Sequence, residues 1–236
     1  MSIIALVSSK GGAGKSTAAG ALAGAYAQRG DEVLVLDLDD NRTLWTALSA
    51  SQVPGITVEK VEVPDFSRVL QERAGSGAFD RIIVDVPGAS GEALALAIGR
   101  SHVSIIPARL SRADVDEAYK TAHRMLNLFA SFGKRGVFRV LVSAAPSIES
   151  ASETNARQVI DELQMPRFVT ELKHRAPYNE LFATGKPPHF NDIGRENVRR
   201  AVAELDALVM EIDALIDVGV AGEGRGVATA AGRGGS

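Results

Sequence analysis

The chain contains no cysteine, few aromatic residues and no apolar run long enough to span a bilayer. Without cysteine it can form no disulfide, no thiolate nucleophile and no cysteine-held iron–sulfur cluster. Its 26 Lys and Arg residues against 29 Asp and Glu residues give a net charge of −3. Because the whole chain is close to neutral, any contact with DNA has to come from a local basic patch. No signal peptide precedes the first strand-like segment, so we expect a cytoplasmic protein.

Apolar residues make up 45% of the 236 residues, which is enough for the core of one sizeable domain. Short β-branched segments alternate with longer amphipathic ones. This alternation predicts βα crossovers and therefore an α/β fold, with a mostly parallel twisted sheet flanked by helices on both faces. Strands are expected at residues 3–7, 32–37, 81–85, 103–107, 138–142 and 168–172, with a half-exposed edge strand at 57–63, and helices at 15–29, 67–73, 91–100, 113–132, 152–163 and 191–217.

The last part of the chain differs in composition from the rest. Residues 219–236 are rich in Gly and Ala and carry few large apolar groups, so we expect a disordered tail after a single domain at residues 1–218. The preceding helix has one apolar stripe and an acidic polar face. That face suits docking on the domain's own core, whereas an anionic membrane would call for Lys and Arg.

A glycine-rich loop, VSSKGGAGKST at residues 7–17, lies between the first predicted strand and the first predicted helix. Its glycines allow a tight turn that brings backbone N–H groups close to an anion, and the helix start adds its dipole. Lys15 is expected to reach the β- and γ-phosphates, Ser16 to ligate Mg²⁺ and Thr17 to reach the α-phosphate. The strict P-loop pattern is missed only because Ser9 stands where it requires Gly. The candidate nucleotide-binding residues are Lys10, Gly11, Gly12, Ala13, Gly14, Lys15, Ser16 and Thr17.

Carboxylates follow two other predicted strands. The segment VLVLDLDD ends in Asp37, Asp39 and Asp40, and RIIVDVPG places Asp85 before a Pro-Gly turn. A carboxylate that ends an apolar strand beside a phosphate loop is well placed to hold Mg²⁺ or its waters. Ser16, Asp37 and Asp85 are therefore the candidate metal-binding residues. Asp40 is equally well read as a solvated aspartate at a strand end.

Together these motifs resemble those of the ParA/MinD family of P-loop ATPases. KGGAGKST is similar to the family's deviant Walker A motif, DLDD to its switch I, and IIVDVPG to its Walker B and switch II. The resemblance implies a homodimer that sandwiches two ATP molecules, with Lys10 crossing to the partner's nucleotide. It also implies that Asp39 orients the attacking water while Asp37 supports Mg²⁺. On this basis the catalytic residues are Lys10, Lys15 and Asp39.

The switch I segment departs from the usual DxDPQ, because Asp40, Asn41 and Arg42 stand in place of Pro-Gln. A similar run, and a similar IPARLSRADVDEA segment at residues 106–118, is found in the plasmid-transfer and T-DNA-processing branch of ParA-like proteins. No helix-turn-helix precedes the loop, so the chain resembles the small ParA type without an N-terminal DNA-binding domain.

The resemblance further implies non-specific DNA binding by the ATP-bound dimer, weak ATPase activity stimulated by a ParB-like or other adaptor protein, and association with the nucleoid. Two stretches could supply the cations. One, at residues 118–148, contains Lys120, Arg124, Lys134, Arg135 and Arg139 and no acidic residue. The other, at residues 173–200, contains the residues that we favour as DNA contacts: Lys173, Arg175, Arg195, Arg199 and Arg200.

Other functions remain open at this stage. One alternative is a MinD-like membrane ATPase, although the acidic final helix argues against membrane binding. Another is an ATPase that positions a protein-only cargo, and a third is a metabolic enzyme on the same P-loop scaffold, such as an amidoligase. The sequence does not identify the cargo or the stimulating partner.

Overall fold

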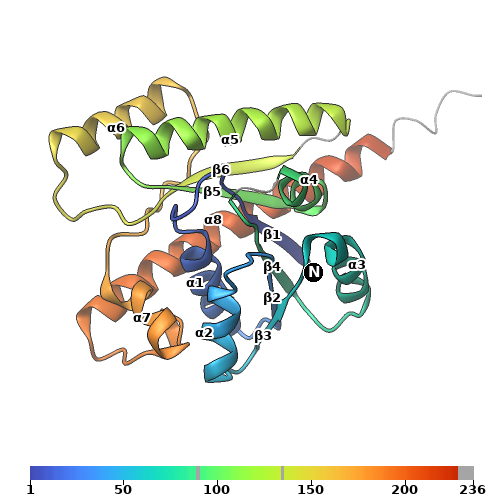
Figure 1. Cartoon of the computed structure of the whole chain (residues 1–236), viewed down its shortest axis with the longest axis horizontal. Helices are drawn as coiled ribbons and strands as arrows, with labels where there is room; N and C mark the ends of the chain where they lie inside the picture. The colour runs from blue at the N-terminus through green and yellow to red at the C-terminus, as the bar shows by residue number, and fades with distance from the viewer. Residues whose placement is uncertain (89–90, 134–135, 228–236) are drawn as a thin grey trace, which may run out of the picture.

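A computed structural model describes residues 1–88, 91–133 and 136–227 of the chain. Six strands form one sheet in the order β3-β2-β4-β1-β5-β6, and every strand pair is parallel. Helices cover both faces of the sheet (Figure 1), which confirms the predicted α/β fold. In chain order the elements are β1 Ser2–Leu6, α1 Lys15–Gln28, β2 Val33–Asp37, α2 Thr43–Ser51, β3 Ile56–Lys60, η1 Val63–Asp65, α3 Phe66–Gly75, β4 Arg81–Asp85, α4 Gly91–Arg100, β5 Val103–Ala108, α5 Arg112–Ser131, β6 Val137–Val142, α6 Ala151–Glu162, α7 Ala176–Thr184, η2 Pro188–Phe190 and α8 Glu196–Val227.

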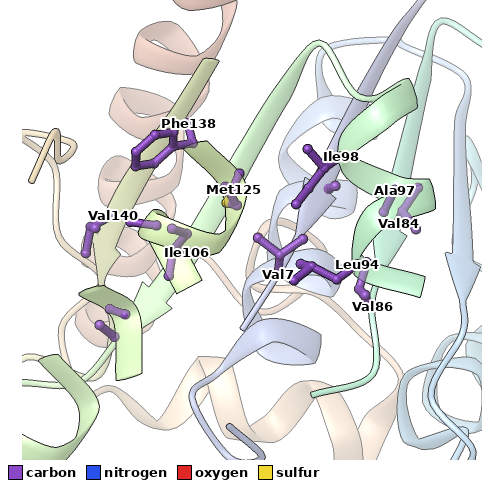
Figure 2. Packing of buried hydrophobic residues seen from close by; sticks show 14 of the residues in the cluster. Val7, Val84, Val86, Leu94, Ala97, Ile98, Ile106, Met125, Phe138 and Val140 are labelled. Atoms are coloured by element: carbon purple, nitrogen blue, oxygen red, sulfur yellow. The ribbon is translucent and has the colours of Figure 1, made fainter. Parts of the chain in front are cut away.

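Two apolar cores lie on opposite faces of the sheet because successive residues of a strand point to opposite sides. Ile4 and Leu6 of β1 pack with α1, α2, α7 and α8, while Ile3 and Ala5 pack with α3, α4, α5 and α6. Figure 2 shows part of the second core, where Val7, just after β1, lies among side chains from β4, β5, β6, α4 and α5. Burial on both faces explains why the strands read as continuous apolar runs.

Helix α1 is buried along most of its length, and its small residues allow neighbouring elements to approach closely. A Cβ atom at Gly20 would lie 2.5 Å from the side chain of Leu181 in α7 and 2.8 Å from that of Leu44 in α2. A Cβ atom at Gly24 would lie 2.2 Å from Pro187. The small-residue run after the glycine-rich loop therefore packs α1 tightly between the sheet and three other elements.

The strand predictions are confirmed except for the last one. β3 is an edge strand with partly exposed side chains, as predicted for residues 57–63. Residues 168–172 do not form a strand, although isolated bridges at Arg167 and Lys173 connect this segment to the region of β6. The N–H groups of Phe168 and Leu172 also donate to carbonyls of β6. Between these contacts, the N–H groups of Val169 and Thr170 donate to the carboxylate of Glu211 in α8, so no continuous ladder forms.

Helices α2 and α7 were missed, although α7 has a proline in its first turn and ends at Gly185 in the left-handed conformation. The final helix was expected at residues 191–217, but α8 begins at Glu196 and continues to Val227. This corrects the predicted start of the tail, because residues 219–227 are helical. The remaining tail residues, 228–236, lie outside the described part of the chain.

The acidic residues of α8 bind the domain's own groups. Glu204 accepts hydrogen bonds from Arg175 and from the Tyr178 hydroxyl. Asp213 accepts from the hydroxyl of Tyr26 and pairs with Arg81. This docking agrees with the prediction for the acidic face. Across the described ranges, no helix is both long and apolar enough to cross a membrane.

Candidate nucleotide-binding site

Sheet register brings the motif residues together at the carboxyl ends of three neighbouring strands. Asp85 at the end of β4 pairs with Leu6 of β1 on one side and with Asp37 of β2 on the other. The glycine-rich loop follows β1 directly. Ligands of parallel α/β sheets bind outside the carboxyl ends of the strands, so the loop and both carboxylates border the same crevice.

The loop has the backbone conformation that its glycines predict. Gly12 and Gly14 have φ angles of 78° and 97°, a region that other residues rarely adopt, and Gly14 is the N-cap of α1. Ser16 and Thr17 lie in the first turn of α1, beside the unpaired N–H groups and the positive end of the helix dipole. Lys15 begins that turn and is buried, with its Nζ 3.5 Å from the carbonyl oxygen of Lys10.

The end of β6 also holds the glycine-rich loop in place. The hydroxyl of Ser143, just after β6, donates a 2.9 Å hydrogen bond to the carbonyl oxygen of Ala13. Ser143 is itself buried, and its N–H bonds the carbonyl of Ala108. Because the Ala13 carbonyl is bound there, the peptide that joins Ala13 to Gly14 is oriented with its N–H on the opposite side. Sequence reasoning missed Ser143, which carries no recognisable motif.

Asp85 is fully buried, and neither of its carboxylate oxygens has a hydrogen-bond partner among the described residues. Burial raises the pKa of Asp85 to about 7, with the nearby Asp37 carboxylate adding to the effect of burial and the Ser16 hydroxyl and Lys15 ammonium opposing it. An orphaned buried carboxylate is costly unless a cation or a bound water uses it. The residues at this point therefore fit a Mg²⁺ ion or its waters, with Ser16 beside them.

The carboxylate of Asp37 is already engaged. It accepts hydrogen bonds from the N–H groups of Asp39 at 3.0 Å and of Trp45 at 2.9 Å. Burial raises the pKa of Asp37, although these two N–H donors lower it. Asp37 thereby anchors the start of α2, and each oxygen keeps one further lone pair for a metal-bound water.

Asp39 is only partly buried and lies in the turn that follows. One of its carboxylate oxygens accepts the N–H of Asn41 at 2.9 Å, and its carbonyl accepts the N–H of Arg42. Arg42 has a φ of 51° and pairs with Glu62 at 2.5 Å, which attaches this turn to the segment after β3. The Asp-Asn-Arg segment that replaces the usual Pro-Gln thus forms an ordered turn. Asp40 is exposed.

Lys10 lies apart from Lys15. Its side chain is 43% exposed, and its Nζ donates to the carboxylate of Asp114 at the start of α5 over 2.6 Å. The two lysines of the loop therefore occupy different environments, one buried under the loop and one on its outer side.

A cavity of about 390 Å³ adjoins the loop and the first turn of α1. Besides Gly14 and Thr17, its wall includes cationic and imidazole side chains that sequence reasoning did not assign to the nucleotide site. These are Arg109 after β5, and Lys173, His174 and Arg175 before α7. Two of the residues predicted to contact DNA, Lys173 and Arg175, therefore line a cavity next to the loop, and Arg175 is bound to Glu204 at 2.7 Å.

The other predicted DNA contacts gather near the start of α8. Arg195 pairs with Glu180 at 2.5 Å and Arg200 with Glu196 at 2.5 Å. Arg199 donates to the backbone carbonyls of Ile193 and Gly194. Arg195 precedes α8 instead of lying within it, so the three arginines do not share one helical face.

In the first basic stretch, Lys120 pairs with Glu117 on its own helix, and Arg124 is exposed. Lys134 and Arg135 lie outside the described residues. Arg139 donates to the carbonyl of Phe138. This stretch therefore offers one exposed arginine, Arg124, without an acidic partner among its described side chains.

A glycine-rich loop between β1 and α1, a buried lysine and a strand-end aspartate define a P-loop ATPase of the ParA/MinD type. Comparison with known proteins gives the family. The family model described as VirC1 protein matches residues 1–217, and the chain belongs to the VirC1 family.

Individual relatives agree with this assignment. The chain is 26% identical over 215 residues to protein ParA of Rhizobium radiobacter, covering 90% of this chain and 96% of that protein. It is 34% identical over 136 residues to protein virC1 of the same organism, covering 56% and 59%. Among solved structures, a McdA–ATP complex from Cyanothece superposes with a TM-score of 0.69 at 18% identity, covering 88% of this chain and 96% of that one, which shows the shared fold.

Proposed function

We propose that this chain is an ATPase that dimerises when it binds ATP, binds DNA without sequence preference and positions a plasmid or another cargo, with hydrolysis resetting the dimer. The observation that carries the proposal is Asp85 beside a phosphate-binding loop, because its buried carboxylate has no hydrogen-bond partner in the part of the chain that the structure describes. The solved McdA–ATP complex with the same fold supports ATP as the nucleotide.

Different residues around the loop would bind the phosphates, Mg²⁺ and the nucleoside. The N–H groups of residues 11–17 and the buried ammonium of Lys15 would hold the phosphates. Ser16 and Asp85, with Asp37 through a water, would hold Mg²⁺, which neutralises phosphate charge when bound. The cavity beside Gly14 and Thr17 would take the nucleoside, against the guanidinium and imidazole groups of its wall.

Asp39 is proposed to orient the attacking water. Its carboxylate is held by Asn41 on one oxygen, is partly exposed, and lies at the end of the strand that borders the phosphate site. Lys10 is proposed to act on the nucleotide of a second copy, because Lys15 already occupies the route to the chain's own phosphates and Lys10 lies on the outer side of the loop.

DNA contact is proposed for Arg195, Arg199 and Arg200, whose side chains are exposed near the start of α8. Lys173 and Arg175 are better assigned to the cavity wall. Two weak patches in one dimer would bind DNA as a linked pair at high effective concentration, which couples DNA binding to ATP. A ParB-like or other adaptor protein is proposed to stimulate hydrolysis, and DNA binding would associate the protein with the nucleoid.

Lys10→Ala tests this proposal, with Lys15→Ala as the matched comparison in the same loop. If Lys10 acts in trans, Lys10→Ala binds ATP normally as a monomer but forms no ATP-dependent dimer and does not hydrolyse ATP. Lys15→Ala should bind ATP at least about tenfold more weakly, because hydrogen bonds between charged groups contribute about 1.5–3 kcal/mol. Light scattering measures the dimer, and equilibrium binding of a fluorescent ATP analogue measures the affinity.

Two results would contradict the assignments. Weaker ATP binding by the Lys10→Ala monomer would place Lys10 on its own nucleotide, and normal ATP affinity in Lys15→Ala would remove the loop from the phosphate site. Sedimentation with DNA and with liposomes, each with ATP and with ADP, separates DNA positioning from membrane binding. Absence of both kinds of binding in ATP at low salt would favour a protein-only cargo.

A further inference from the structure

The carboxylate that binds Lys10 is itself fixed. Asp114 lies in the first turn of α5 and its side chain is 10% exposed. One oxygen binds the ammonium of Lys10 at 2.6 Å, and the other accepts the hydroxyl of Ser111, the N-cap of α5, at 2.8 Å. The Ser111 hydroxyl oxygen in turn accepts the N–H of Asp114 at 3.1 Å. The acceptor for Lys10 is thus held by the helix cap.

The base of the Lys10 side chain is held as well. The Ser8 hydroxyl oxygen accepts the N–H of Lys10 at 3.1 Å, and the same hydroxyl donates to the Lys10 carbonyl at 3.2 Å. A Cβ atom at Gly88 would lie 3.0 Å from the Lys10 carbonyl carbon, so the loop after β4 packs directly on this peptide. Both ends of a long flexible side chain are therefore restrained.

We propose that Asp114 is a positioning residue that holds the ammonium of Lys10 on the outer side of the loop, ready for the phosphates bound by a second copy of this chain. The inference rests on the proposed trans role of Lys10. Helix α5 carries none of the nucleotide motifs. Through Asp114 it would hold Lys10 in position while the protein is still a monomer.

The bond to Asp114 lowers the entropy cost of placing Lys10 on a phosphate and leaves N–H donors of its ammonium free. A free lysine side chain carries about 2 kcal/mol of rotamer entropy, which has to be lost when it binds a phosphate. Since Asp114 restrains Lys10 in the monomer, part of that cost precedes association, and preorganised groups bind more tightly. An ammonium has three N–H donors, so the bond to Asp114 leaves two for a phosphate.

The experiment compares Asp114→Asn with Asp116→Asn in an Asp39→Ala background. Asp116 lies two residues further along the same helix, is partly exposed and pairs with Arg112, so its variant removes the same charge. ATP-dependent dimerisation is measured by light scattering, and ATP affinity at concentrations where the protein is monomeric. Asp114→Asn is expected to weaken the dimer about five- to thirtyfold with unchanged monomer affinity for ATP, and Asp116→Asn to change neither.

A double-mutant cycle separates positioning from a structural effect on α5. The cycle is measured on the free energy of unfolding of the nucleotide-free monomer, because Lys10→Ala is expected to form no dimer. If Asp114 acts through Lys10, Asp114→Asn lowers that free energy less in the Lys10→Ala protein than in the protein that keeps Lys10. Ser111→Ala keeps the carboxylate but removes one of its restraints, so it should weaken the dimer in the same direction by a smaller factor. It also serves as the test if Asp114→Asn does not fold.

Each other outcome overturns the inference. A tighter dimer in Asp114→Asn would make the ion pair a restraint that opposes dimerisation, and an unchanged dimer would leave Asp114 without a role. An equal loss of unfolding free energy on Asp114→Asn with and without Lys10 would mean that Asp114 only stabilises α5. If the protein carrying only Asp39→Ala forms no ATP-dependent dimer, the proposed function fails too. If it dimerises through Lys10 but not through Asp114, only this inference fails.

Discussion

Asp37 and Asp85 are register partners at the ends of β2 and β4 and are both buried. Within residues 1–88, 91–133 and 136–227, hydrogen-bond donors reach the carboxylate of Asp37 but not that of Asp85. The donors are backbone N–H groups at the start of the next helix and in the turn before it. One aspartate therefore anchors local structure, and its neighbour keeps both oxygens for an incoming group. This difference makes Asp85 the more informative position for experiments on the nucleotide-free protein.

Asp85→Asn should change how stability depends on pH. The pKa of Asp85 is raised to about 7 in the folded protein, against about 3.9 for an ordinary aspartate. Between these values the folded protein keeps a proton that the unfolded chain has released. The contribution of Asp85 to the free energy of unfolding therefore falls as pH rises, by at most about 1.4 kcal/mol per pH unit.

The measurement is urea unfolding of the nucleotide-free protein at pH 5 and pH 8. Asp85→Asn should gain stability relative to the wild type as pH rises, because the amide has no charge to bury. Mg²⁺ and ATP should stabilise the wild type at pH 8 and not the variant. Parallel pH profiles for the two proteins would show that Asp85 does not titrate in this window.

Asp39→Ala should separate binding from turnover. The variant keeps Lys15 and Asp85, so we expect ATP binding and the ATP-dependent dimer to persist while hydrolysis stops. Asp40→Ala is the matched control, since Asp40 is the adjacent exposed carboxylate and should leave phosphate release unchanged. Normal turnover in Asp39→Ala would transfer the water-orienting role to Asp37 or Asp85.

Ser143→Ala should weaken ATP binding without touching the phosphate-binding residues. Losing its hydrogen bond to the Ala13 carbonyl releases the peptide that presents the N–H of Gly14, at a cost of about 1 kcal/mol, which is about fivefold in affinity. Ser104→Ala is the control, because Ser104 is also buried but its hydroxyl pairs with Ser101 instead. Equal ATP affinities in the two variants would argue against a role for Ser143 in shaping the loop.

Arg199→Ala should reduce the salt dependence of DNA binding. Its guanidinium donates to backbone carbonyls and pairs with no carboxylate of the described residues, whereas Arg195 and Arg200 each have a glutamate partner that offsets their charge. If Arg199 contacts a phosphate, its loss flattens the slope of log K against log salt by about one unit. Arg195→Ala should flatten it less. An unchanged slope in the triple variant of Arg195, Arg199 and Arg200 would move the contact to Arg124 and the rest of the first basic stretch.

Local sequence determined the parts of this protein that depend on short-range chemistry. Parallel strands buried on both faces are almost entirely apolar, so β1, β2, β4 and β5 could be recognised from their sequence alone. Only glycine readily adopts the φ angles at residues 12 and 14, so the phosphate loop was visible as a motif. Asp85 was recognisable because a charge rarely ends an apolar strand without a function.

Tertiary structure decided what depends on partners distant in sequence. The segment at residues 168–172 has strand-like residues, but Glu211 of α8 accepts the N–H groups of Val169 and Thr170, and no local pattern shows that competition. Lys10 meets Asp114 over a separation of 104 residues, and Ser143 meets Ala13 over 130. From the sequence, Arg175 is indistinguishable from a basic surface residue, but in the structure it pairs with Glu204 and lines a cavity. Hydrogen bonds and ion pairs of this kind follow from how α5, α8 and β6 pack around the loop, because their energies depend on distance and burial and not on neighbours in the chain.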